Sequence, residues 1–123
     1  MTREIVKYVA GKPYSLATRA GNMVFLAGQI ALDQDEVPVS GGIGPEMRQT
    51  MQNVVDVLKD AGATLEDVTM VNIYMTDLEG DYGQMNQVYT EYFGDKDLPA
   101  RATVGVSELA LGLCVEVSCI AVV

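Results

Sequence analysis

Histidine is absent from this chain of 123 residues, and cysteine occurs only twice. Without histidine, the Ser-His-Asp and Cys-His catalytic triads and the histidine-dependent zinc sites are excluded. Cys114 and Cys119 are an odd number of positions apart in one expected strand, so their side chains face opposite ways and cannot bridge within it. We expect two reduced thiols and no metal site. Any catalysis must then rely on carboxylates, arginine, hydroxyl groups, backbone groups and water.

Basic residues are also scarce. The chain has 8 Lys and Arg against 17 Asp and Glu, which gives a net charge of −9. Phosphate backbones are neutralised by clustered Lys and Arg, and no basic cluster with interleaved aromatic residues occurs. We therefore expect no nucleic-acid partner.

Long apolar runs are missing too. No stretch of about 18 apolar residues could cross a bilayer, and the N-terminus lacks the apolar core of a signal peptide. The sequence predicts a cytoplasmic protein with no membrane association. Its length favours a single domain that spans residues 1–123.

The apolar pattern predicts an α+β protein. The expected elements are strands at 5–9, 14–19 and 23–30, a helix that begins at Pro45 and ends at 61–62, a strand at 68–75, a helix at about 81–93, and final strands at 102–106 and 113–123. Both helices should pack on one face of a mixed sheet. The other face would then be an exposed apolar surface, which self-association would cover.

Glu116 is the most informative residue that is present. It lies in the apolar run 113–123, which we expect to be a buried strand, and an ionised carboxylate there needs compensation. Arg101 precedes the neighbouring strand-like run 102–106. If the two strands are neighbours, the guanidinium and the carboxylate could hold a small acid beside a proton acceptor. The alternative is a structural ion pair.

Four separated segments match one family pattern. They are Pro13-Tyr14-Ser15, Gly21-Asn22 with Ala27-Gly28-Gln29-Ile30, Pro99-Ala100-Arg101, and Val115-Glu116-Val117 with Ile120-Ala121-Val122. In this order they resemble the RidA (YjgF) family of reactive-intermediate deaminases. The resemblance extends over essentially the whole chain.

The resemblance implies a chorismate-mutase-like fold and a homotrimer with active sites between subunits. Such sites hydrolyse enamines and imines, for example 2-aminoacrylate and 2-iminopropionate, to 2-oxo acids and ammonia, without a metal or organic cofactor. It assigns the substrate carboxylate to Arg101 and the handling of water to Glu116. The other implied pocket residues are Tyr14, Gly28, Asn86 and Thr103.

The chain departs from the family pattern at several positions. Lys12 stands near the expected pocket entrance, Ala27 and Thr103 replace a frequent Ser and Cys, and Ser118 replaces a frequent Glu. These changes bear on the substrate range. Two alternatives therefore stay open: a non-catalytic trimer that binds small carboxylates or acts as a regulator, and a deaminase of a larger enamine such as 2-aminomuconate.

Overall fold

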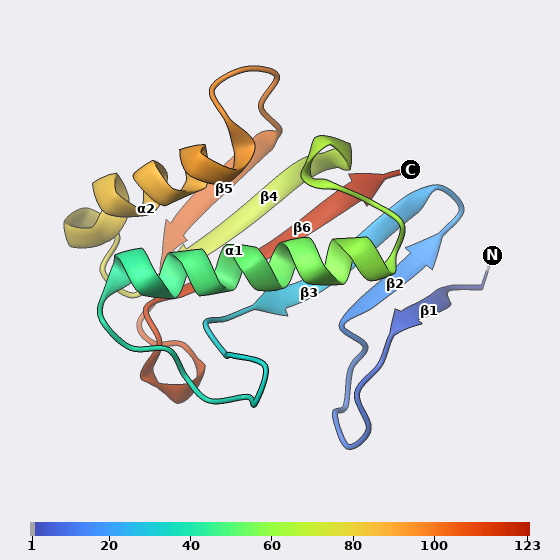
Figure 1. Cartoon of the computed structure of the whole chain (residues 1–123), viewed down its shortest axis with the longest axis horizontal. Helices are drawn as coiled ribbons and strands as arrows, with labels where there is room; N and C mark the ends of the chain where they lie inside the picture. Colours follow the sequence, from blue (N-terminus) through green and yellow to red (C-terminus); the bar gives the residue numbers. More distant parts are fainter. Residues whose placement is uncertain (1) are drawn as a thin grey trace.

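The computed structural model describes residues 2–123, which form a six-stranded sheet with two helices across one face (Figure 1). The strands are β1 (Glu4–Lys7), β2 (Ala17–Ala20), β3 (Met23–Gln29), β4 (Val68–Met75), β5 (Ala100–Gly105) and β6 (Val115–Val122), and the helices are α1 (Ile43–Asp60) and α2 (Leu78–Phe93). The strand order is β1-β2-β3-β6-β4-β5. Only the β4–β5 pair within these residues is parallel, so the sheet is mixed. The predicted α+β fold is confirmed.

Helix α1 holds the core together because its apolar residues recur at helical spacing. Its fully buried side chains pack beneath β3, β4 and β6; they include Met47, Met51, Val54 and Leu58. Truncation of such a side chain to alanine costs about 2–5 kcal/mol. The packing of α1 against one face of the sheet therefore stabilises the fold.

Both helices begin earlier than predicted. Helix α1 starts at Ile43, so Pro45 lies in the first turn, where its missing N–H costs no helical hydrogen bond. Helix α2 starts at Leu78, because the Asp77 carboxylate accepts a hydrogen bond from the Gly80 backbone N–H at 3.1 Å. Asp77 lies between the predicted strand at 68–75 and the predicted helix at about 81–93, and the structure shows that it caps the helix.

Burial of β6 is one-sided, contrary to the expectation of a strand buried on both faces. Val115, Val117 and Cys119 lie beneath the helices, whereas Glu116 and Ser118 alternate with them and are half-buried on the opposite face. The pleat of the strand explains the difference, since successive side chains point to opposite faces. Glu116 therefore faces away from the helix layer.

The face that carries no helix is apolar. Its exposed large side chains include Ile5, Met23, Phe25, Val104 and Val122. We refer to it as the open face. A surface of this kind on a small protein is typical of an interaction site.

No helix within residues 2–123 has the length and apolar character needed to cross a membrane.

Candidate active site

Arg101 and Glu116 lie on opposite faces of the sheet. Strand β4 separates β5 from β6, so the two residues are not on neighbouring strands as the sequence reasoning required. Arg101 aligns with Val71, which is buried beneath the helices, whereas Glu116 aligns with Tyr74 on the open face. Strands two places apart are separated by about 10 Å. One chain therefore does not bring the guanidinium and the carboxylate into one pocket.

A structural ion pair between them is likewise absent from this chain. The ion pairs among residues 2–123 are Lys7–Asp60, Lys12–Glu36 and Arg48–Glu91. Arg101 has no carboxylate partner in this part of the chain.

Two tyrosines of α2 hold the Arg101 guanidinium instead. Its carbon Cζ lies 4.7 Å from the ring centre of Tyr89 and 5.8 Å from that of Tyr82, and Nη2 donates a hydrogen bond to the Tyr82 hydroxyl at 3.0 Å. Aromatic faces attract a cation without neutralising its charge. Arg101 is thus a positioned cation that can still bind an anion.

Asn86 and Thr103 stand beside Arg101. Asn86 lies one turn after Tyr82 on α2. A hydrogen bond with its amide is the main factor that lowers the pKa of the Tyr82 hydroxyl, and the positive charge of Arg101 lowers it further. Thr103 is two residues from Arg101 on β5 and so shares its face. Its hydroxyl oxygen is buried and has no hydrogen-bond partner within residues 2–123. Such orphaned groups in a native protein often point to a site for water or a ligand.

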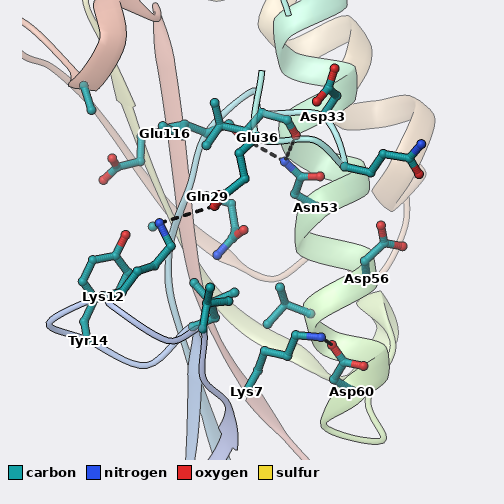
Figure 2. Close-up of a pocket in the computed structure, with 18 residues that line it drawn as sticks. Lys7, Lys12, Tyr14, Gln29, Asp33, Glu36, Asn53, Asp56, Asp60 and Glu116 are labelled. Atoms are coloured by element: carbon teal, nitrogen blue, oxygen red, sulfur yellow. Dashed lines mark hydrogen bonds and ion pairs between the residues drawn. The ribbon is translucent and has the colours of Figure 1, made fainter. Parts of the chain in front are cut away.

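The other predicted residues line a pocket of about 410 Å³ that lies among the β1–β2 connection, the end of β3 with the loop after it, and α1, and that also reaches Glu116 on the open face. Tyr14, Gly28 and Glu116 come from the β1–β2 connection, from β3 and from β6 respectively (Figure 2). The β3–β6 register shifts between Leu26 and Gln29, the stretch that contains Gly28. An added Cβ at Gly28 would lie 2.7 Å from the Glu116 carboxyl carbon. Glycine is thus required for the carboxylate to lie flat against β3.

Burial alone raises the pKa of the Glu116 carboxyl above its usual value. Arg101 of the same chain does not lower this pKa, because the guanidinium lies on the other face of the sheet. A carboxylate with a raised pKa binds protons more readily and is suited to act as a base and then as an acid.

Lys12 and Gln29 complete the pocket near Glu116. The Lys12 ammonium is 3.5 Å from a Glu36 carboxylate oxygen and 5.9 Å from the ring centre of Tyr14. The Gln29 side chain points into the pocket and is bound only through its Nε2, which donates to the Ala27 carbonyl at 3.2 Å (Figure 2). Asn53 of α1 fixes the wall by donating to backbone carbonyls in the loop after β3.

The six predicted site residues thus divide into two groups. Arg101, Thr103 and Asn86 form one group against α2, and Glu116, Tyr14 and Gly28 form the other in the pocket. Tyr82 and Tyr89 were not identified as site residues from the sequence. Their spacing of seven residues, two turns of one helix, was the available signal.

The chain is an α+β protein in which the predicted site residues form two separate groups, one around the Arg101 guanidinium and one around the Glu116 carboxylate. The sequence model described as Endoribonuclease L-PSP matches residues 5–123. A RutC family protein from Pyrococcus abyssi is 42% identical over 111 residues, 89% of this chain and 85% of that protein. The mitochondrial protein mmf2 of Schizosaccharomyces pombe is 39% identical and covers 94% of this chain and 91% of its own length.

A crystal structure from Yersinia pestis, YyfA of the conserved Rid protein family, aligns with a TM-score of 0.93 and 31% identity over 99% of this chain and 100% of that chain. The chain belongs to the endoribonuclease L-PSP family, which includes the RidA (YjgF) and RutC proteins. The resemblance seen in the sequence is confirmed. Because a mitochondrial protein is among the relatives, membership does not assign the chain to the cytoplasm.

Proposed function

We propose that this protein hydrolyses 2-imino acids and their enamine tautomers to 2-oxo acids and ammonia. The observation that carries the proposal is Arg101, a positioned guanidinium with no carboxylate partner among residues 2–123. It can bind the carboxylate of a small acid through two parallel hydrogen bonds. The orphaned Thr103 hydroxyl supports a ligand at the same place.

Glu116 supplies the proton transfers in this proposal. A protonated imine has an electrophilic carbon, so water attacks it directly while Glu116 accepts a proton from that water. The new C–O bond gives a carbinolamine, and Glu116 then returns the proton to the nitrogen. As the C–N bond breaks, the carbinolamine hydroxyl gives its proton to Glu116, the C=O bond forms, and ammonia leaves and takes up that proton. General acid-base catalysis of this kind contributes roughly 100-fold to 10,000-fold.

The complete site requires a second copy of the chain. Arg101 faces the helix layer at the β5 edge, and Glu116 faces the open face, so each can meet the other only across an interface between copies. The apolar open face offers the surface for that contact. We propose a homotrimer, in which a cyclic arrangement pairs Arg101 of each subunit with Glu116 of the next.

Cleavage of RNA, which the family's description names, is not the function we propose. The chain has a net charge of −9, and Arg101 is an isolated cation rather than part of a basic surface. Phosphate backbones would be repelled. A small acid needs only one guanidinium.

A coupled assay tests the proposal. An amino-acid oxidase with catalase generates 2-iminopropionate in situ, and the protein should accelerate release of pyruvate and ammonia. Arg101→Ala should reduce kcat/KM by roughly 100-fold or more, because orientation and the charge-assisted bonds are both lost. Arg48→Ala is the matched control, since Arg48 forms only an exposed ion pair with Glu91. Failure to accelerate any of several imino acids would favour the non-catalytic carboxylate-binding alternative.

A further inference from the structure

The Glu116 pocket contains a second cation, Lys12, that hydrolysis of a simple imino acid does not use. We infer that Lys12 binds a second acidic group on the substrate, so that 2-imino dicarboxylic acids are the preferred substrates; this rests on the proposed function. Arg101 of one subunit would hold the carboxylate next to the imine, and Lys12 of the other would hold the distal carboxylate.

The pocket of one chain has room for more than a three-carbon acid. Its volume of about 410 Å³ corresponds to more than ten water molecules at about 30 Å³ each. In Figure 2, Lys12, Tyr14 and Glu116 stand at one end of the pocket and the Lys7–Asp60 pair at the other. A substrate whose reacting carbon lies at Glu116 therefore has the Lys12 ammonium at the same end of the pocket, where a second carboxylate on a longer chain can turn towards it.

Lys12 forms only a weak ion pair with Glu36. Glu36 is 3.5 Å away and its side chain is 64% exposed, whereas the Lys12 side chain is 30% exposed. An ion pair with so exposed a partner contributes little, because water screens it. Glu36 belongs to the surface loop after β3 and can turn to solvent when a substrate carboxylate takes its place.

The other charges of the pocket restrict where an anion can bind. Lys7 is paired with Asp60 at 3.2 Å, and Asp56 of α1 adds a further negative charge. Asp33 is fixed by hydrogen bonds from the backbone of residues 35 and 37. These acids repel a carboxylate from the α1 end of the pocket. Lys12 is thus the position at which a second carboxylate is accepted.

The test compares substrates of different charge. Oxidases acting on aspartate, glutamate and alanine generate 2-iminosuccinate, 2-iminoglutarate and 2-iminopropionate, and the readout is the ratio of kcat/KM for each dicarboxylic imine to that for 2-iminopropionate. In Lys12→Met this ratio should fall about 10-fold to 100-fold, the effect of one charge-assisted bond. In Glu36→Gln the ratio should rise, because Lys12 loses its competing partner. Lys96→Met, the matched control, should keep the wild-type ratio, because Lys96 is exposed and does not line this pocket.

Equilibrium binding separates this inference from the function on which it rests. Calorimetry with oxaloacetate, 2-oxoglutarate and pyruvate measures the preference for a second carboxylate without turnover. A preference that Lys12→Met removes supports the role of Lys12 even if no imine is hydrolysed, in which case the proposed function fails. Unchanged ratios in folded Lys12→Met and Glu36→Gln, in kinetics or in binding where turnover is absent, would overturn the inference.

Discussion

Glu116 and Gly28 show how closely two residues of adjacent strands depend on each other. The carboxylate of Glu116 occupies the space that a side chain at position 28 would fill. The same close approach helps to bury the carboxyl group. One glycine therefore determines both where the proposed base stands and how readily it holds a proton.

Substitution of Gly28 should affect catalysis more than folding. In Gly28→Ala the new methyl group would displace the flexible end of Glu116, and a misplacement of about 1 Å can cost about 100-fold in rate. We expect kcat to fall by about that factor with little change in Tm. Gly83→Ala is the control: nothing lies within 4 Å of its added Cβ, and a helical alanine should stabilise by about 0.5–1 kcal/mol. Equal effects of the two variants on kcat would contradict the role of Gly28.

The raised pKa of Glu116 predicts two pH dependences. The base must be ionised in free enzyme, so kcat/KM should rise with pH through a pKa above the ordinary value of 4.5. Stability should run the other way: burial disfavours the charged carboxylate, so its contribution is most favourable when protonated and is lost as pH rises through that pKa. Glu116→Gln should therefore gain stability relative to wild type over the same interval. Denaturant titrations of wild type and Glu116→Gln across this pH range measure the difference between their free energies of unfolding. A difference that does not change with pH would mean that the Glu116 carboxyl is not desolvated.

The sequence indicates some of the candidate site residues but not the contacts that their side chains make. Arg101 and Glu116 were identified because a charge beside apolar strand residues stands out locally. The Tyr82 hydroxyl bond to Arg101 links residues 19 positions apart, and no local pattern reveals it. The same applies to the Lys12–Glu36 pair, which joins two surface loops.

At the scale of elements, helix α2 positions the Arg101 guanidinium, which binds the substrate carboxylate in the proposed function. It carries Tyr82 and Tyr89, and its first turn depends on the Asp77 cap. Gly80 is needed there because the capping carboxylate folds closely against it. The position of Arg101 thus depends on a hydrogen bond at the start of a neighbouring helix.

Loss of the α2 cap should destabilise the protein measurably. Asp77→Ala removes the acceptor for the Gly80 N–H and should cost about 1 kcal/mol, or about 4 °C in Tm. Asp77→Asn keeps a capping oxygen and should retain most of the stability. Thermal unfolding followed by circular dichroism checks both. A wild-type Tm in Asp77→Ala would mean that the cap is not needed.

The existence of each element followed from periodicity, but the strand order did not. Alternation and helical spacing identify the strands and both helices, because side chains must face one core. The placement of β6 between β3 and β4 depends on long-range pairing that no local pattern encodes. That placement is what separates Arg101 from Glu116.

At the scale of the whole molecule, the open face and the divided site point to the same requirement. The exposed apolar side chains favour burial against another surface, and in the proposed function Arg101 and Glu116 meet only when they come from different copies. Family resemblance already implied a trimer, whereas the division of the six residues between two faces became visible only in three dimensions. The proposed assembly satisfies both needs with one interface.

Mixing two inactive variants tests the shared site directly. Arg101→Ala and Glu116→Gln should each be nearly inactive. When they are unfolded together and refolded as mixed oligomers, about a quarter of the interfaces should combine an intact Arg101 with an intact Glu116. Activity should recover to about that fraction of wild type. Each variant refolded alone is the control, and a mixture as inactive as its components would place both residues of a site in one chain.

If the proposed assembly is correct, the separation of Arg101 from Glu116 within one chain would also make activity depend on the concentration of the protein. A freshly folded single copy would carry every required side chain and yet catalyse nothing until it met its partners. Specific activity should then decline on dilution, as the oligomer dissociates, while the fold of each chain persists. Because β4 separates Arg101 from Glu116 in each chain, the specific activity would depend on the protein concentration.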